Sequence, residues 1–199
     1  TSASADTSEG MECQTNAHST FSLTASDGYV STPDGNSIYM WSYRNSSGGF
    51  QLPGPTLCVT SGDAVTIVLH NTLSEATSIL FPGQTGVKAD GNPAQPQFDG
   101  GGSLSSLVQS AAPVNGSVTY TFTAGSPGTY PHESGTDVNK QVQMGMFGAL
   151  VVRPVGHPDQ VNNRPDSRFT PGKDYVFLLS EVDPAVHVAV ERNQPIDWK

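Results

Sequence analysis

The residues best suited to chemistry gather in Gly128–Pro154, which reads GTYPHESGTDVNKQVQMGMFGALVVRP. His132 stands next to Glu133, and Asp137 follows a few residues later. Imidazole and carboxylate groups are common metal ligands in proteins, so these three residues form a candidate metal site. A histidine beside a carboxylate at a strand end is, however, more commonly solvated. The remaining histidines are scattered and lack the spacing of a zinc or iron ligand set: His18, His70, His157 and His187.

The two cysteines, Cys13 and Cys58, are 45 residues apart and form neither a Cys-x-x-Cys motif nor a zinc ligand set. An even pair at this distance predicts a disulfide that ties the N-terminal segment to a core strand, worth about 2–4 kcal/mol. Such a bond needs an oxidising compartment, so we expect a secreted, periplasmic or extracellular protein. Two independent buried thiols are the alternative.

Several other functions are disfavoured. The net charge of −9 repels phosphate backbones and anionic lipids, so nucleic acid is not an expected partner. No run of 18 apolar residues predicts a membrane span, and no signal segment is recognisable at the start of the sequence. A Gly-x-Ser-x-Gly elbow is absent, and Gly100–Gly102 lacks the Lys and Ser/Thr of a phosphate-binding loop.

The elements that position these residues are predicted to be strands. Only 14% of the residues are charged and Gly plus Pro contribute 36, a composition that favours many short strands and turns. In Ala64–Asn71, Val65, Ile67 and Leu69 fall on one face. Nine segments read as strands: Phe21–Thr32, Ser37–Tyr43, Leu57–Thr60, Ala64–Asn71, Thr77–Phe81, Ser117–Thr123, Gly128–His132, Gly148–Val152 and Tyr175–Glu181. The first two flank Pro33-Asp34-Gly35-Asn36 and predict a hairpin.

The sequence between these strands is irregular. Gln84–Pro113 is a long loop rich in Gly and Pro, expected to cover one end of the sandwich. His157–Lys173 is a polar connector, Tyr175–Glu181 is expected to be a last buried strand, and Asp183-Pro184 can start a short helix that Pro195 would end. We divide the chain into an N-terminal extension (1–19), a β-sandwich domain (20–156), and a connector, last strand and start of an interdomain linker (157–199).

Three ordered segments carry a family resemblance: LPGPTLCVTSGDAVTIVLHNTL, TSILFPGQ and the stretch ending MGMFGALVVRP. Together they resemble the first cupredoxin domain of the multicopper oxidases, roughly from Gly35 to Pro154 and again at Glu181–Pro184. The resemblance implies an all-β, cupredoxin-like Greek-key sandwich, with the Gly/Pro-rich loop and a short C-terminal extension added to it.

The same resemblance locates the metal positions. Family members place four histidines of a trinuclear copper cluster where this chain has Leu80, Pro82, Glu133 and Gly135, so each of these ligand positions is substituted. The copper nitrite reductases, which are relatives, carry a blue-copper site in the same loop. Its Cys corresponds to Ser134, a His falls near Gln141, and its Met is matched by Met146. A lone thioether cannot hold copper, so Met144 and Met146 are predicted to be core or loop-packing residues.

Three functions follow as hypotheses. The first is a copper-free N-terminal cupredoxin domain with a structural role, packing against further cupredoxin domains or sister subunits and lining a substrate channel with Gln84–Pro113. The second is part of an active copper-dependent oxidase or reductase whose ligands lie in later domains, so copper is expected only in a longer protein. The third is a stand-alone sandwich that binds a small ligand or glycan, although the long loop offers only Phe98 as an aromatic.

Overall fold

Alternating apolar and polar residues build the larger of the two sheets that form the sandwich. The computed structural model describes residues 13, 15–16 and 18–198. The larger sheet has the strand order β2-β1-β4-β9-β5-β6. Its strands are β1 (Thr20–Ser31), β2 (Ser37–Asn45), β4 (Ala64–Asn71), β5 (Lys88–Ala89), β6 (Asn92–Pro93) and β9 (Gly116–Thr123). Val65, Ile67 and Leu69 of β4 are buried, which confirms the predicted face.

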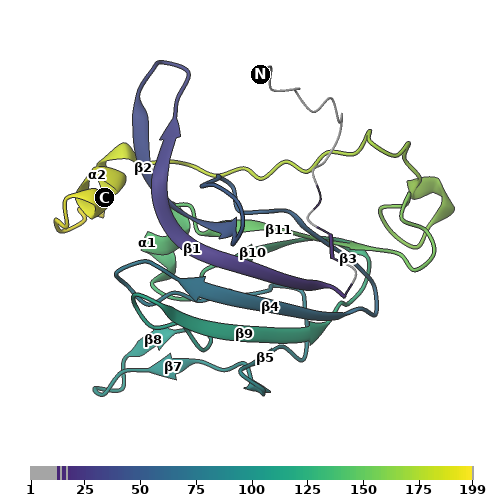
Figure 1. The fold of residues 1–199 in the computed structure, drawn as a ribbon, viewed down its shortest axis with the longest axis horizontal. Helices are drawn as coiled ribbons and strands as arrows, with labels where there is room; N and C mark the ends of the chain where they lie inside the picture. The colour runs from purple at the N-terminus through teal and green to yellow at the C-terminus, as the bar shows by residue number, and fades with distance from the viewer. Residues whose placement is uncertain (1–12, 14, 17, 199) are drawn as a thin grey trace.

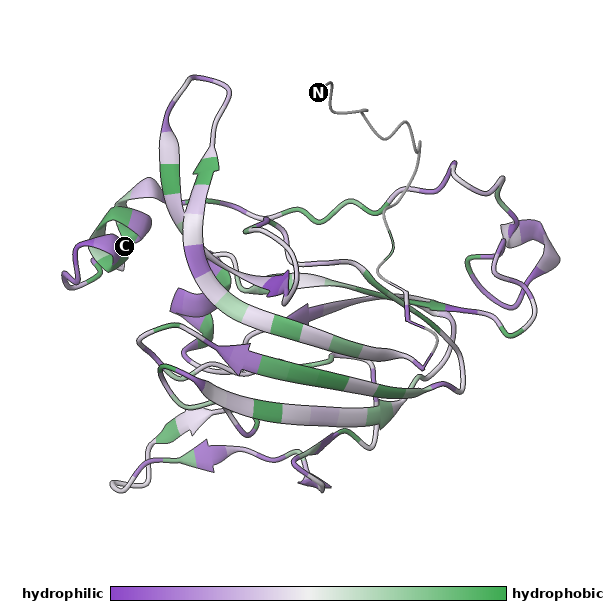
Figure 2. Cartoon of the chain, viewed as in Figure 1, coloured by the Kyte–Doolittle hydropathy of each residue, from purple (hydrophilic) through white to green (hydrophobic). Residues whose placement is uncertain are grey.

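The smaller sheet lies behind the first and consists of β10 (Gly128–Glu133), β11 (Phe147–Arg153) and β3 (Leu57–Thr60). β10 is antiparallel to β11, and β11 is parallel to β3. The two sheets are stacked as layers (Figure 1), and apolar side chains of both form one core, which confirms the all-β sandwich. Figure 2 shows apolar residues recurring along β1, β4 and β9.

The predicted hairpin is present and is longer than the sandwich needs. β1 and β2 pair antiparallel from Leu23–Asn45 to Ser31–Ser37, around a turn at Gly35 with φ +87°. Its tip projects beyond the two sheets (Figure 1). The long strand β1 also pairs in parallel with β4, so the hairpin is a direct extension of the core sheet.

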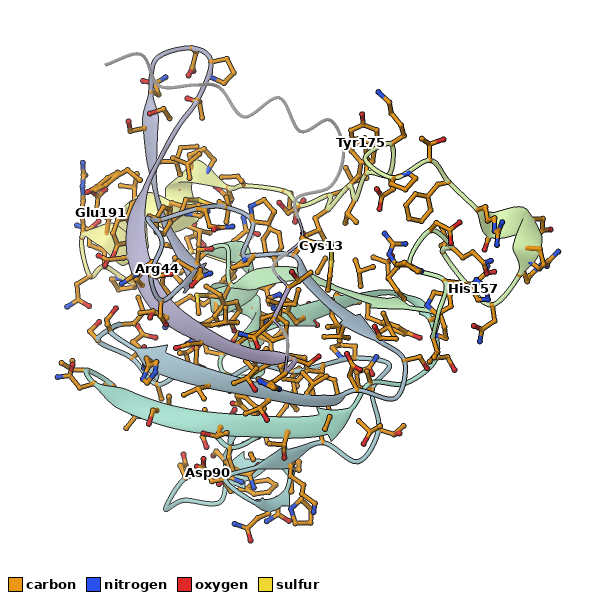
Figure 3. The ribbon with its side chains drawn as sticks, turned by 45° about the vertical axis from the view of Figure 1, so that its right-hand side comes forward. Cys13, Arg44, Asp90, His157, Tyr175 and Glu191 are labelled. Atoms are coloured by element: carbon orange, nitrogen blue, oxygen red, sulfur yellow. A yellow bond between two sulfur atoms is a disulfide. The ribbon has the colours of Figure 1, made fainter. Side chains whose placement is uncertain are left out.

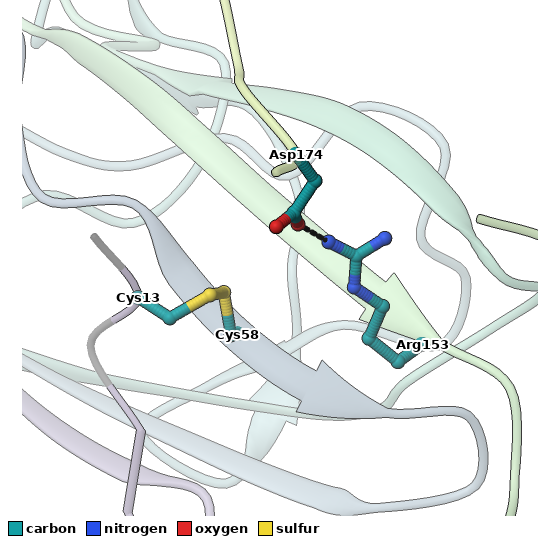
Figure 4. Close-up of a disulfide and its surroundings, with 4 residues drawn as sticks. All are labelled: Cys13, Cys58, Arg153 and Asp174. Carbon is teal, nitrogen blue, oxygen red and sulfur yellow. Dashed lines mark hydrogen bonds and ion pairs between the residues drawn. A yellow bond between two sulfur atoms is a disulfide. The ribbon is translucent and has the colours of Figure 1, made fainter. Parts of the chain in front are cut away.

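The predicted disulfide joins Cys13 to Cys58, with a Cα–Cα distance of 5.5 Å. Cys58 lies on β3, so the bond ties the segment before β1 to the smaller sheet (Figure 4). No cysteine in the chain is left free.

Two predictions for the middle of the chain need correction. Thr77–Phe81 is not a regular strand, because Thr77 pairs with Ala111 and Leu80 pairs with Glu133, two different segments that leave no room for a continuous ladder. Gln84–Pro113 is not structureless. It contains β5 and β6, which extend the larger sheet past β9, and the pair β7 (Gln97–Phe98) and β8 (Leu104–Ser106).

Helical turns occur at three places. The loop between β10 and β11 contains the helix α1 (Val138–Gln143), which the sequence did not predict. A 3-10 turn, η1, spans Pro165–Ser167 in the polar connector. The helix α2 (Pro184–Glu191) starts where predicted, with Asp183 accepting a hydrogen bond from the Ala185 amide at 2.9 Å, but it ends before Pro195. Among the described residues, no helix has the length and apolar character needed to cross a membrane.

The prediction of a last buried strand at Tyr175–Glu181 is wrong. This outer segment joins no sheet and runs in the open between the connector and α2 (Figure 1). Its apolar pattern is that of a strand, but it pairs with no strand of either sheet in the described part of the chain.

Candidate functional site

His132 lies on β10 opposite Gly148 of β11, and its side chain points into the core. Its Nε2 lies 3.2 Å from the carbonyl oxygen of Pro55, and the rings of Tyr43 and Phe81 lie 5.8 and 6.4 Å away. The imidazole is fully buried, which lowers its pKa to about 4 and keeps it neutral. The expectation that His132 is solvated is therefore wrong.

Gly148 makes room for this imidazole. A Cβ added to Gly148 would lie 2.4 Å from Nε2 of His132. The Pro55 carbonyl oxygen can only accept a hydrogen bond, so in the neutral ring Nε2 carries the proton that it donates to Pro55. The other ring nitrogen, Nδ1, has no hydrogen-bond partner among the described residues. His132 is thus a packed core residue with one unused acceptor.

Asp137 and Glu133 do not join His132. The Asp137 carboxylate forms an ion pair at 2.9 Å with Lys140, which also pairs with Glu75 at 2.6 Å. Burial alone would lower the pKa of Lys140, but hydrogen bonds to these two carboxylates raise it above its usual value. The half-buried carboxylate of Glu133 has no hydrogen bond or ion pair within the described residues.

The structure does bring together the two segments that carry the substituted ligand positions. Leu80 and Glu133 form an antiparallel bridge, with Leu80 N donating to the Glu133 carbonyl at 2.7 Å. A Cβ added to Gly135 would lie 2.9 Å from Cγ of Leu80, so the leucine fills the space that a side chain at 135 would need. Pro82 and Leu80 line an apolar cavity of about 280 Å³.

Ser134 and Gln141 meet in a buried hydrogen-bonded group. The Gln141 side-chain oxygen accepts from Ser134 Oγ at 2.6 Å and from Thr77 Oγ1 at 2.8 Å, while its NH₂ donates to the Ala76 carbonyl at 2.8 Å. Thr77, Ser134 and Gln141 are all buried; we call these three residues the Gln141 cluster. Each of their side-chain polar groups has a partner.

Met146 adjoins this cluster through the backbone. Its amide donates to the Gln141 carbonyl at 2.9 Å, and its carbonyl accepts from the Ser134 amide at 3.0 Å. Met144 and Met146 are fully buried in the main core, as predicted. The thioether of Met146, the amide of Gln141 and the hydroxyl of Ser134 thus come from one short loop folded around α1.

A second group of hydroxyls lies next to Gly135. Thr136 Oγ1 lies 2.9 Å from both Ser78 Oγ and Ser106 Oγ, and the two serine oxygens are 3.2 Å apart. The Gly135 amide donates to Ser78 Oγ at 3.2 Å. These contacts join three distant segments of the chain without a charged group.

The chemistry available at these positions is hydrogen bonding. Within the residues that the structure describes, no three His, Cys, Asp or Glu side chains gather as a metal-binding group. Hydroxyl and amide oxygens are poor ligands for copper compared with thiolate and imidazole.

Sequence reasoning missed Thr77, Ser78, Ser106 and Thr136. Serine and threonine are frequent at strand surfaces and turns, so their types alone gave no sign of burial. One available signal was the position of Thr77 and Ser78, three and two residues before Leu80, in a segment with a proposed metal position.

Comparison with known proteins gives the family. Residues 32–156 match the multicopper oxidase family. The chain is 32% identical over 149 residues to the multicopper oxidase CTB12 of Cercospora beticola, covering 73% of this chain and 20% of that protein. It is 34% identical over 124 residues to the iron transport multicopper oxidase fetC of Epichloe festucae (strain E2368), covering 56% and 18%.

Solved structures give the same result for the fold. The chain resembles a copper nitrite reductase from Nitrosomonas europaea with a TM-score of 0.51 and 25% identity, over 69% of this chain and 42% of that one. The chain spans about a fifth of the length of the curated relatives it matches. The expected cupredoxin-like fold is thereby confirmed, and the chain belongs to the multicopper oxidase family.

Proposed function

We propose that residues 20–156 are a first cupredoxin-like domain that has lost its own copper ligands and has a structural role in a larger multicopper-oxidase-like protein. The Gln141 cluster is the observation that carries this proposal. It stands where the resemblance implies a blue-copper site, and its hydroxyl and amide groups bind each other.

The arrangement of Thr77 supports the proposal independently. A blue-copper site takes one Cys, two His and a weakly bound Met. Ser134, Gln141 and Met146 match three of these positions by resemblance, and Thr77 is the further side chain that contacts Gln141 Oε1. We assign Thr77 to the position of the remaining histidine. Thr77, Ser134, Gln141 and Met146 are all buried, so their side chains are out of contact with solvent.

The packing around Leu80 supports the loss of the trinuclear positions. A histidine at 135 is incompatible with Leu80 at its observed position, because even a Cβ there would lie 2.9 Å from Leu80 Cγ. Leu80 and Gly135 form a matched pair, and restoring one ligand alone would not rebuild a site.

The structural role is one of packing against further domains. The curated relatives are about five times as long as the matching segment, and multicopper oxidases pair cupredoxin domains with one another. The Cys13–Cys58 disulfide supports an oxidising compartment, so we place the protein outside the cytoplasm, in a secreted, periplasmic or extracellular setting.

Copper quantification tests the absence of a site. The purified 199-residue chain, incubated with Cu²⁺ and then dialysed against a weak chelator, is expected to retain far less than one copper per chain. One tightly held copper per chain would overturn the proposal.

A designed variant supplies the positive control. Thr77→His, Ser134→Cys and Gln141→His together provide the missing ligands around Met146, and the variant is expected to bind one copper with the intense visible absorption of a copper–thiolate bond. If this variant folds and binds none, the assignment of these positions to a former blue-copper site is wrong.

A second function applies to a longer polypeptide. The relatives named as multicopper oxidases favour a complete protein that is a copper-dependent oxidoreductase, with its copper ligands in other domains. Metal analysis and oxidase assays of the longer polypeptide test this. Absence of both copper and oxidase activity would contradict it.

A further inference from the structure

A groove of about 540 Å³ lies between the projecting hairpin and the helix α2. Its volume is within the range of small-molecule sites in proteins. One wall comes from the hairpin turn and the start of β2, as far as Tyr39, and the other comes from one side of α2, from Pro184 to Glu191. Figure 1 shows α2 beside the hairpin, away from the stacked sheets. The function proposed above makes no use of this groove.

Contacts within the chain hold both walls of the groove in place. His187 Nδ1 donates to the Tyr39 carbonyl oxygen at 2.6 Å, and the Tyr29 hydroxyl donates to the carboxylate of Glu191. Tyr29 and Tyr39 are opposite each other on the two hairpin strands, and their rings meet edge to face with centroids 5.6 Å apart. Figure 3 shows Glu191 on α2, beside the hairpin. The helix is therefore fixed against the hairpin at both a ring nitrogen and a carboxylate.

The groove carries negative charge on both walls. Asp34 lines the hairpin wall, and Glu191 lines the helix wall. Hydrogen bonds from Thr32 and Asn36 hold the pKa of Asp34 below its usual value, so this carboxylate stays ionised. None of the described residues that line the groove is a Lys or an Arg. The two carboxylates are therefore not neutralised by a cationic side chain of the groove itself.

His187 also lines the groove and adds no positive charge to it. The residue is 1% exposed, and burial lowers the pKa of its imidazole, which is therefore neutral at pH 7. Because Nδ1 carries the proton donated to Tyr39, Nε2 is an acceptor, and it has no hydrogen-bond partner among the described residues. The helix wall thus contains an unused acceptor in addition to its carboxylate.

The rest of the lining is largely apolar. Pro33, Ile38 and Tyr39 contribute to the hairpin wall, and Pro184 and Val188 contribute to the helix wall. An aromatic ring such as that of Tyr39 attracts cations to its face, and aliphatic side chains bury the apolar part of a ligand. A bare metal ion has no use for such a surface, whereas an organic cation matches both the charges and the apolar walls.

We propose that this groove binds a small organic cation, an ammonium group carried on an apolar body. The ammonium pairs with the carboxylates of Asp34 and Glu191, and the apolar body packs against Tyr39 and Val188. Charge-assisted hydrogen bonds to ionised acceptors are the strongest that side chains make, and they favour a cation over a neutral molecule of the same shape. The inference is independent of the proposed structural role, because the groove lies outside the segments that carry the substituted copper positions.

A pair of probes with the same apolar body tests the proposal. Phenethylammonium is titrated into the 199-residue chain, and amide chemical shifts are followed by NMR. Saturable binding is expected, with the largest shift changes at Tyr39, Val188 and Glu191. Phenethyl alcohol, which lacks the charge, is expected to bind at least about 10-fold more weakly, because hydrogen bonds to charged groups are lost.

Glu191→Gln removes a charge and keeps an oxygen that can accept from the Tyr29 hydroxyl. The affinity for phenethylammonium should fall about 10-fold, and that for phenethyl alcohol should not change. Glu181→Gln is the matched control, because Glu181 is exposed and does not line the groove. It should change the affinity by less than about 2-fold in physiological salt, where distant charges are screened.

A second variant tests the location of the site. Val188 is 39% exposed on α2, so Val188→Lys can be accommodated without disturbing the core. The new side chain places an ammonium of the chain itself in the groove and should abolish binding of phenethylammonium. Retained affinity in this variant would mean that the cation binds elsewhere.

Four further results would overturn the proposal. The first is the absence of saturable shift changes at the groove, and the second is equal affinity for the cation and the alcohol. The third is an equal loss of affinity in Glu181→Gln and Glu191→Gln, which would indicate attraction to the overall negative charge. The fourth is binding of a lysine-rich peptide at the groove without binding of phenethylammonium, which would identify a protein partner. Copper analysis is separate, so tightly bound copper would contradict the proposed function and leave this test unaffected.

Discussion

The Gln141 cluster and the outer segment differ in whether their polar groups find hydrogen-bond partners, and their apolar groups find burial, within the described chain. In the Gln141 cluster, every buried side-chain polar group is hydrogen-bonded, and no charge is left without a partner. In the outer segment, apolar side chains face solvent and the backbone is unpaired within the described chain. The first region is complete in itself, and the second is incomplete.

Under the proposed function, this difference is the one between a copper site that has been lost and a surface that another part of a longer protein completes. A site that loses its metal must replace each ligand with a group that satisfies its neighbours, since an unpaired buried polar group costs about 1–3 kcal/mol. The cluster fulfils that requirement. A surface completed elsewhere has no such requirement, so its apolar residues and free backbone remain.

The largest effect is expected from Gln141→Leu. The leucine removes the acceptor of Thr77 and Ser134 and the donor to Ala76, and we expect the free energy of unfolding to fall by about 4 kcal/mol. Urea denaturation measures this. Gln143→Leu, in the same helix, is the control and should cost less than about 1 kcal/mol. Equal costs would show that the cluster does not hold the loop.

The second-largest loss of stability is expected from acid, because His132 is buried as a neutral imidazole. The folded pKa of His132 is about 4 and its usual value is 6.5, so between these pH values the unfolded chain binds a proton that the folded chain does not. Stability is therefore lost as the pH falls from 6.5 to 4, by about 3 kcal/mol from this residue. The free energy of unfolding, measured by urea denaturation at several pH values across this range, should depend less on pH in His132→Leu than in the unchanged chain. An unchanged pH slope in the variant would contradict the assignment.

A smaller effect is expected at Gly135. Its added Cβ would meet Leu80, so Gly135→Ala should cost about 1–2 kcal/mol. Leu80→Ala removes the clash, and in that background the same change should cost less than about 0.5 kcal/mol. A double-mutant cycle measures this coupling. Additive costs would mean that the two residues do not compete for space.

The smallest effect is expected at the outer segment. Leu179 is 94% exposed, so Leu179→Asp in the 199-residue chain should change the free energy of unfolding by less than about 0.5 kcal/mol. Leu150→Ala, at a buried position of β11, should cost about 3 kcal/mol in parallel measurements. A large loss from Leu179→Asp would mean that the segment is packed within this domain, and the contrast with the Gln141 cluster would fail.

Local pattern was enough to predict the strands that pair inside the domain. The bounds of β3 and β4 match the prediction, because both strands alternate clearly and Ser61-Gly62-Asp63 separates them. The same rule failed at Tyr175–Glu181. An apolar pattern predicts that a segment is buried in a sheet, but it does not identify the domain that supplies the neighbouring strand.

The candidate site was predictable in outline. The resemblance identified Ser134, Gln141 and Met146, and the structure places them together. The contact of Thr77 with Gln141 could not be predicted from local pattern, because it spans 64 residues. The helix α1 was missed because it is six residues long and Asp137 gives it no side-chain cap.

The contact between α2 and the projecting hairpin has a mechanical consequence. His187 Nδ1 lies within hydrogen-bond distance of the Tyr39 carbonyl oxygen, and the Tyr29 hydroxyl donates to the carboxylate of Glu191. Glu191 is labelled on α2, beside the hairpin, in Figure 3. Tension applied beyond α2 is therefore carried into β2 and β1, and through them into the larger sheet, before it reaches Tyr175–Glu181. The contacts of α2 with the hairpin thus attach the end of the described chain to the larger sheet by a route that does not pass through Tyr175–Glu181.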